Sequence, residues 1–229
     1  MANLLIVIPA YNEEKNIERV VGELTAGYGE FDYIIINDGS KDGTAQLCRE
    51  RGYRLVDLPV NLGLAGAFQT GLKYAWQHGY EYAIQFDGDG QHRPEYIKPM
   101  LDKIQEGYDI VIASRFLEVK KPHSLRMLGS NLIQEALRMT TGADIHDPTS
   151  GMRMFNRKMI REFAQGLNYG PEPDTLSYLL KNGAKVAEVQ VTMEERLAGV
   201  SYLTPVNAAK YMLRMLISIL LIQNFRRRD

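Results

Sequence analysis

Two aspartates separated by a single glycine stand where a buried strand is expected to end. The apolar run 82–86 is bounded by turn residues and predicts a strand, and Asp87-Gly88-Asp89 follows it directly. Carboxylates at this spacing can converge on one hard cation, because Mg²⁺ and Mn²⁺ are usually held by one or two carboxylates together with substrate phosphates. The segment favours a metal-bound diphosphate substrate, and its alternative interpretation is a simple turn.

Polar segments also follow two earlier apolar runs. Residues 9–13 (Pro-Ala-Tyr-Asn-Glu) and 37–40 (Asn-Asp-Gly-Ser) each come directly after a predicted strand. Asp38 could accept hydrogen bonds from a base or a ribose, and the same turn could begin a helix with a serine or aspartate as its N-cap. Asn61 to Gly63 opens another predicted helix, whose N-terminus favours anions, although packing of the helix on a sheet explains its small residues equally well.

The elements that must position these residues alternate along the first half of the chain. Short apolar strands alternating with helices predict an α/β fold, with a parallel sheet covered on both faces and ligands at the carboxyl ends of its strands. The second half is less regular, with a helix, a polar loop that runs into a short strand, and one more strand. The predicted strands are 3–9, 32–37, 53–58, 82–87, 109–114 and 185–192, and the predicted helices are 13–26, 42–51, 63–79, 94–106 and 124–139.

Composition excludes several classes of function. The net charge of −1 gives no general attraction to nucleic acid, and the single cysteine, Cys48, permits no intrachain disulfide and fits a reducing compartment. No stretch approaches the ~20 apolar residues of a transmembrane helix, and residues 4–8 are too short for a signal-peptide core. We therefore expect a cytoplasmic protein.

Taken together, these motifs resemble the family 2 glycosyltransferases, whose nucleotide-sugar-binding domain is the GT-A fold. The resemblance covers almost the whole chain, and within the family it is strongest to the dolichyl- and polyprenyl-phosphate sugar synthases. It rests on residues 9–13, 37–40, 42–44, 61–63, 87–92, 113–115, 147–155 and 194–196, with Gly199 and Ser201. It implies a catalytic domain over 1–204 and transfer of a sugar, with inversion, from a UDP- or GDP-sugar to a polyprenyl phosphate such as dolichyl or undecaprenyl phosphate.

The resemblance also assigns roles to residues. A set of residues would bind the nucleotide sugar: Pro9, Ala10, Tyr11, Glu13, Asp38, Asn61, Gly63, Asp87, Gly88, Asp147 and Glu172. Asp87, Asp89 and Gln91 would face a Mg²⁺ or Mn²⁺ ion and the diphosphate. Asp89 would be catalytic together with Arg115, Arg126 and Arg196, the arginines that would meet the acceptor phosphate.

Two alternative functions remain open at this stage. A family 2 transferase acting on a glycan hydroxyl would need a general base, and Asp147 or Glu172 could serve. The second alternative is a non-catalytic subunit that binds nucleotide sugar, although such a subunit would have no need for both Asp87 and Asp89. A nucleotidyltransferase is disfavoured, because no glycine-rich basic loop follows the first predicted strand.

The tail 205–229 predicts an amphipathic helix with a wide apolar arc. Lys210, Arg214 and Ser218 form one narrow polar stripe, and Arg226-Arg227-Arg228 follows. The helix could pack on the protein's own domain or on a partner, or it could lie in a membrane interface with its arginines near anionic lipid. Because a polyprenyl phosphate lies in the bilayer, we expect peripheral attachment at the cytoplasmic face of the membrane, directly or through a small membrane-spanning partner.

Overall fold

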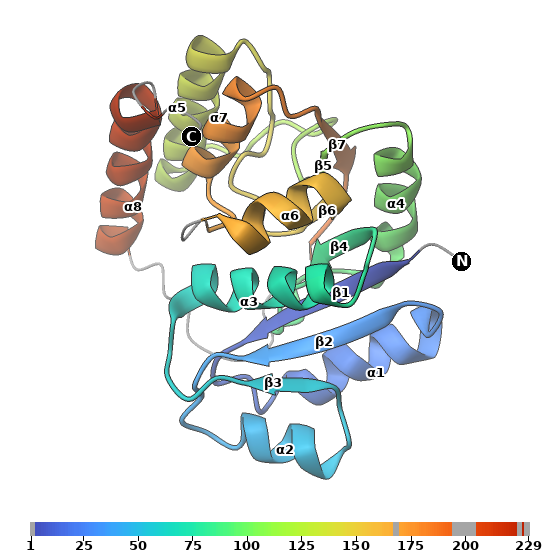
Figure 1. Cartoon of the computed structure of the whole chain (residues 1–229). Coiled ribbons are helices and arrows are strands. Elements are labelled where there is room, and N and C mark those ends of the chain that lie inside the picture. The colour runs from blue at the N-terminus through green and yellow to red at the C-terminus, as the bar shows by residue number, and fades with distance from the viewer. Residues whose placement is uncertain (1–2, 167–169, 194–204, 224–225, 227–229) are drawn as a thin grey trace.

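A mostly parallel sheet forms the centre of the molecule. The structure is a computed structural model that describes residues 3–166, 170–193, 205–223 and 226, and within these residues seven strands pair in the order β3-β2-β1-β4-β6-β5-β7 (Figure 1). β6 is antiparallel to both neighbours and the other pairs are parallel. The strands are β1 (Leu4–Ala10), β2 (Asp32–Asn37), β3 (Leu55–Asp57), β4 (Tyr82–Gln85), β5 (Ile110–Ser114), β6 (Arg153–Asn156) and β7 (Val186–Gln190).

Helices cover both faces of this sheet, which confirms the α/β fold class expected from the sequence. One face carries α1 (Ile17–Tyr28), α2 (Thr44–Glu50) and α4 (Ile97–Gln105), and a 3₁₀ turn (Pro94–Tyr96) precedes α4. The other face carries α3 (Gly63–Gln77), α5 (Leu125–Thr141), α6 (Arg157–Gln165), α7 (Pro173–Lys181) and α8 (Pro205–Ile217), and a π-helical turn (Ser218–Ile222) follows α8.

The central strand β1 shows why the sheet is buried on both sides. All seven of its residues are buried, and successive side chains point to opposite faces. Leu5 and Val7 lie in the core cluster beneath α3, whereas Ile6 and Ile8 lie in the cluster beneath α1 and α4. A nearly continuous apolar run is what a strand covered on both faces requires.

Two helices of the second half were not expected from the sequence. α6 starts directly after β6, where the side chain of Asn156 caps it by accepting a hydrogen bond from the Met159 amide (3.0 Å). α7 begins at Pro173, a residue suited to a first helical turn. Both helices are only nine residues long, so their apolar periodicity is brief.

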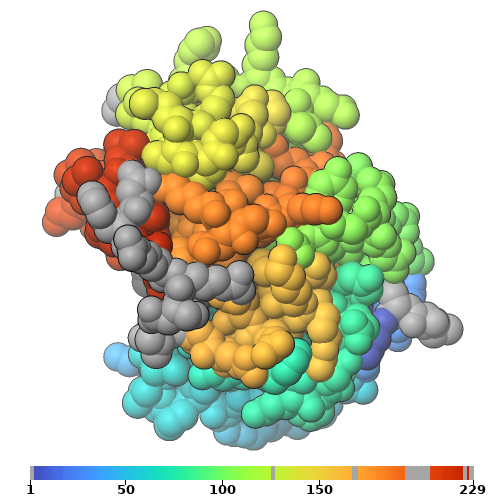
Figure 2. Space-filling view, turned by 45° about the horizontal axis from the view of Figure 1, so that its top comes forward, coloured from blue at the N-terminus to red at the C-terminus, as the bar shows by residue number. Residues whose placement is uncertain are grey.

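The C-terminal helix packs on the body of the protein with one face. α8 contacts α5 and α7 (Figures 1 and 2), and Met215 and Ile219 are buried. Contact with α5 is close, because a Cβ atom added at Gly129 would lie 2.8 Å from Cγ of Met212. The opposite face exposes Leu213, Ile217, Leu220, Leu221 and Ile222. Among the described residues, no helix has the length and apolarity needed to cross a bilayer.

Candidate active site

The carboxyl ends of β2, β1 and β4 lie side by side, and the chain that leaves each strand contacts the next. The amide of Asp38 donates to the carbonyl of Ala10 (2.8 Å), and the amide of Gly88 donates to the carbonyl of Pro9 (3.3 Å). A Cβ atom at Gly88 would lie 3.0 Å from that carbonyl oxygen, so a glycine suits this crossing. The segments around Pro9, Asp38 and Asp87 therefore meet at one edge, where open α/β sheets bind ligands.

The loop after β1 is tied to the loop after β2. Asn12, between Tyr11 and Glu13, adopts a left-handed conformation (φ 57°), which asparagine tolerates better than most residues. Its amide donates to Oγ of Ser40 (2.9 Å), and the amide of Glu13 donates to Oγ1 of Thr44 (2.9 Å). These bonds hold Tyr11 and Glu13 beside the start of α2, with Tyr11 half-buried.

Asp38 holds the start of α3 against the same edge. Its buried carboxylate accepts a hydrogen bond from the Leu62 amide (2.7 Å). Gly39 has a positive φ of 64°, and a Cβ atom there would lie 2.6 Å from the backbone nitrogen of Asn61. Asp38 and Gly39 together therefore bring the segment from Asn61 to Gly63 to the candidate site.

Asp87 and Asp89 stand on a short turn supported from behind by His92. One oxygen of Asp87 accepts from Nε2 of Gln85 (2.9 Å), and the other lies 3.5 Å from Nε2 of His92. The Asp87 amide donates to Nδ1 of the same imidazole (2.9 Å). Oδ1 of Asp89 accepts from the Gln91 amide (3.0 Å), so the turn is fixed by its own side chains.

These residues fit a divalent cation that shares its coordination with a substrate. Asp87 and Asp89 supply hard oxygen donors, and the side chain of Asp87 is 32% exposed. Across the described residues, no group of three or more histidine, cysteine, aspartate and glutamate side chains could enclose a metal ion. A cation bound by two carboxylates and completed by phosphate oxygens is the usual arrangement for Mg²⁺.

On the far side of β4, Arg115 and Asp147 form a two-pronged ion pair. Nε of Arg115 donates to Oδ2 of Asp147 (2.7 Å) and Nη2 donates to Oδ1 (2.8 Å), while the Arg115 amide also donates to Oδ2 (3.1 Å). The Asp147 side chain is 0% exposed. Burial alone would raise the pKa of Asp147, but the hydrogen bonds and charge of Arg115 outweigh it and hold that pKa below its usual value.

The other candidate acid, Glu172, is bound to the C-terminal helix. It lies at the start of α7 and accepts a hydrogen bond from the hydroxyl of Tyr211 on α8. Burial, followed by the charge of Glu172, raises the pKa of Tyr211 well above its usual value.

The buried guanidinium of Arg153 donates to the carbonyls of Pro148 (2.6 Å) and Ser150 (2.9 Å), so it holds the loop that follows Asp147.

The family sequence model described as "Glycosyl transferase family 2" matches residues 5–163, which include the sheet edge, the paired aspartates and the Arg115–Asp147 pair. The chain belongs to glycosyltransferase family 2. The matched segment begins in β1 and ends within α6, two elements that can be located in Figure 1.

Named relatives of this glycosyltransferase are similar along most of their length. Polyprenol monophosphomannose synthase of Mycolicibacterium smegmatis is 28% identical over 224 residues, which cover 92% of this chain and 84% of that protein. UDP-N-acetylglucosamine–dolichyl-phosphate N-acetylglucosaminyltransferase of Methanococcus voltae is 30% identical over 217 residues, covering 83% and 86%.

The fold is shared with a solved transferase. Glucosyl-3-phosphoglycerate synthase of Mycobacterium tuberculosis, in complex with Mn²⁺, UDP-glucose and phosphoglyceric acid, superposes with a TM-score of 0.70 at 18% identity. The match covers 99% of this chain and 81% of the synthase. The expected GT-A architecture is thereby confirmed.

Of the three arginines expected at the acceptor, the structure describes the side chain of Arg115 alone. Arg126 belongs to the first turn of α5, but its side chain is outside the described part of the glycosyltransferase, and Arg196 lies outside the described residues altogether. How the three guanidinium groups lie relative to one another therefore stays a prediction from the sequence.

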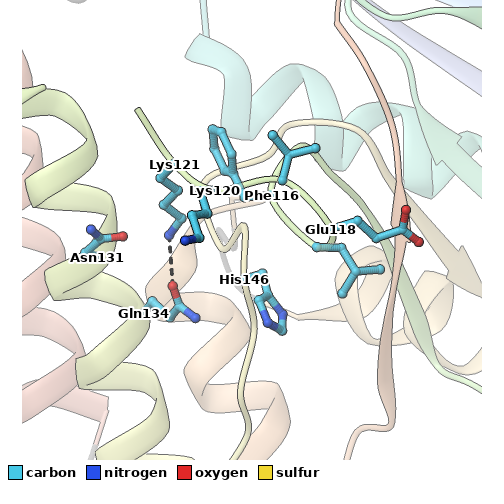
Figure 3. Close-up of a pocket in the computed structure, with 9 residues that line it drawn as sticks. Phe116, Glu118, Lys120, Lys121, Asn131, Gln134 and His146 are labelled. Atoms are coloured by element: carbon cyan, nitrogen blue, oxygen red, sulfur yellow. Dashed lines mark hydrogen bonds between the residues drawn. The ribbon is translucent and has the colours of Figure 1, made fainter. Parts of the chain in front are cut away.

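A cavity of about 380 Å³ is lined by Phe116 and His146, which directly follow Arg115 and precede Asp147 in the chain (Figure 3). The segment after Arg115 and the helix α5 line it, and His146 and Lys121 bring basic groups to it. Nζ of Lys121 donates to Oε1 of Gln134 (2.9 Å) and Oγ of Ser130 (3.3 Å). Burial lowers the pKa of Lys121, and the carboxylate of Asp147 acts in the opposite direction.

The sequence did not reveal that basic side chains line this cavity, or that Arg153 holds the loop that follows Asp147. Lys121 follows Lys120 in a segment without an apolar period, and Arg153 opens a four-residue strand. The sequence did offer one signal, which is that Arg153 lies beside the apolar residues Met154 and Phe155. A buried charge is costly unless it is paired, so an arginine in such a place indicates a partner.

Proposed function

We propose that this glycosyltransferase transfers a sugar from a nucleotide sugar to a polyprenyl phosphate, with inversion at the anomeric carbon. The observation that carries the proposal is the Arg115–Asp147 pair, with a buried acid whose two oxygens are both bound to one arginine. An acid held in this way is a poor general base, but the arginine it orients is suited to a phosphate. The names of the two relatives point to the same class of acceptor.

The donor would lie along the edge formed by β2, β1 and β4. The segments around Tyr11 and Asp38 would hold the base and ribose of a UDP- or GDP-sugar, and the N-terminus of α3 would face its phosphates. Asp87 and Asp89, with Gln91, would bind Mg²⁺ or Mn²⁺, whose charge would offset that of the departing diphosphate.

The acceptor phosphate would supply the nucleophile. One of its oxygens attacks the anomeric carbon, the bond from that carbon to the diphosphate oxygen breaks, and the electron pair leaves with the nucleoside diphosphate. No proton has to be removed, because a phosphate monoester is ionised near neutral pH, with a second pKa of ~6. The protein has instead to position two anionic groups against their mutual repulsion, which is a task for Arg115 and, by the resemblance, for Arg126 and Arg196.

The chain would reach its lipid substrate from the membrane surface. The exposed apolar residues of α8 and its π-helical turn adjoin the exposed bases Lys210 and Arg214, a combination typical of interfacial helices. Attachment at the cytoplasmic face would bring the enzyme to the headgroup layer, where the phosphate of the acceptor lies. A small membrane-spanning partner that covers the same face is the second way to achieve this.

Transfer of radiolabel from a panel of nucleotide sugars tests the proposal. Detergent-solubilised undecaprenyl and dolichyl phosphate would serve as acceptors, with Mn²⁺, with Mg²⁺ or with EDTA, and the Asp89→Ala variant as control. We expect metal-dependent label in the organic phase, and nuclear magnetic resonance of the product should show the anomeric configuration opposite to that of the donor. Bound donor with no lipid product under any condition would contradict the proposal.

A further inference from the structure

β7 presents two polar side chains beneath the Arg115–Asp147 pair. Glu188 and Gln190 stand two residues apart and therefore share one face of the strand. In the parallel pairing of β5 with β7 they lie opposite Ile112 and Ser114, just before the chain reaches Arg115. Nε2 of Gln190 donates to the Arg115 carbonyl (3.2 Å), so this strand already contacts one member of the pair.

Glu188 contacts the other member through the backbone. Oε1 accepts from the Asp147 amide (2.9 Å), whereas Oε2 accepts from the His146 amide (2.8 Å) and faces Nδ1 of the same histidine at 2.9 Å. Because a carboxylate only accepts, that imidazole nitrogen carries its proton. Both oxygens of a side chain that is 5% exposed are therefore engaged, one by the Asp147 amide and the other by the amide and ring of His146.

We propose that Glu188 is a positioning residue, which fixes the peptide before Asp147 and, through the Asp147 carboxylate, aims Arg115 at the acceptor phosphate. This inference rests on the proposed function for the identity of the acceptor. It adds a residue that touches no substrate and lies 73 positions from the arginine it serves. Burying a carboxylate costs free energy unless hydrogen-bond donors hold it in place. The position of the Glu188 carboxylate and that of the 146–147 peptide therefore depend on one another.

The substitution Glu188→Gln isolates this role because it preserves size. The amide NH₂ group has to face the N–H of either His146 or Asp147, and two donors repel one another. The 146–147 peptide then shifts, and the Asp147 carboxylate no longer holds the guanidinium of Arg115 in its position. In the proposed function Asp147 holds Arg115 and does not bind the donor, and the donor segments around Tyr11, Asp38 and Asp87 share none of these hydrogen bonds. Binding of the nucleotide sugar should therefore be unchanged.

Asp109→Asn is the matched control. The Asp109 side chain is 9% exposed and lies at the opposite end of β5, where it accepts hydrogen bonds from the Lys185 amide (2.9 Å), Asn156 (2.9 Å) and Lys158 (3.1 Å). Its conversion to an amide removes a similarly buried carboxylate that joins three strands, without touching the Arg115–Asp147 pair. This variant therefore shows how far loss of stability alone changes the acceptor kinetics.

Two readouts decide the inference. For Glu188→Gln, we expect kcat/KM with farnesyl phosphate as acceptor to fall roughly 10- to 100-fold, as small misplacements do, with donor affinity by calorimetry within about twofold of wild type. The Nε–H resonance of Arg115, assigned through its loss in Arg115→Lys, should shift or broaden in Glu188→Gln and stay in place in Asp109→Asn.

The outcomes separate this inference from the proposed function. An unchanged Arg115 resonance in Glu188→Gln, or an equal loss of acceptor kinetics in Asp109→Asn, overturns the positioning role. A wild-type enzyme that transfers to no polyprenyl phosphate overturns the proposed function, and the resonance still shows whether Glu188 fixes Arg115.

Discussion

At the scale of single residues, Asp147 is more valuable to the site as the partner of an arginine than as a free acid. Both of its oxygens accept hydrogen bonds from Arg115, and Oδ1 also accepts from the Thr149 hydroxyl (3.2 Å). The pairing with Arg115 keeps the pKa of Asp147 below its usual value despite burial. The same distinction applies to Glu172, which is bound to Tyr211. A phosphate acceptor requires no base, so both acids can be used to hold other groups.

The Asp147–Arg115 pair predicts a specific dependence of stability on pH. A carboxyl whose pKa is depressed by folding stabilises the folded state above its unfolded pKa of about 3.9 and loses that contribution as pH falls through the lower folded pKa. Asp147→Asn should cost about 3 kcal/mol at pH 7, because it leaves a partly buried guanidinium without its partner. Urea unfolding from pH 7 to pH 2.5 should then show a shallower decline for the variant than for wild type. Parallel curves would contradict this assignment.

At the scale of elements, the site depends on turns that join neighbouring strand ends. Asp38 bonds to Leu62 across 24 residues, and Gly39 permits the close approach of that segment. The succession of Asp38 and Gly39 after a predicted strand indicated a turn and a binding role. That Asp38 bonds to the Leu62 amide could not be predicted, because it depends on how β2 and the start of α3 meet in three dimensions.

Gly39→Ala tests this junction. The new Cβ atom would lie 2.6 Å from the Asn61 nitrogen at a positive φ, so the segment must move. We expect a loss of about 1–3 kcal/mol in stability and weaker binding of nucleoside diphosphate by calorimetry. Gly52→Ala provides the control, since its φ is also positive (68°) but no atom lies within 4 Å of its Cβ position. Equal donor affinity in the two variants would show that the junction does not shape the donor site.

The same element scale explains what sequence alone could and could not provide. The strands of the first half and the polar residues at their ends were predicted because buried strands are continuous apolar runs and ligands bind at their carboxyl ends. Helices α6 and α7 were missed because nine residues give few turns of periodicity. The bond from Glu188 to Asp147 spans 41 residues and depends on the register of β7, which no local pattern encodes.

At the scale of the whole molecule, the apolar face of α8 is the surface proposed to meet the membrane. Leu221 is 58% exposed on the π-helical turn that follows α8. Leu221→Gln should reduce sedimentation with vesicles of phosphatidylglycerol and phosphatidylcholine several-fold, because less apolar area is buried in the interface. Val60 is also 58% exposed but lies in the loop between the edge strand β3 and α3, outside α8 and its turn, so Val60→Gln should sediment like wild type. Wild-type protein that does not sediment would point to a membrane-spanning partner.

The central claim, that the acceptor is a lipid phosphate and not a hydroxyl, is tested most directly by comparing undecaprenyl phosphate with undecaprenol. The two lipids share one chain and differ only in the phosphate, and both would be offered with the preferred labelled donor and Mn²⁺. We predict a glycosyl phosphodiester from undecaprenyl phosphate and no labelled lipid from undecaprenol. Label on undecaprenol, or on a glycan while both lipids stay unlabelled, would contradict the account.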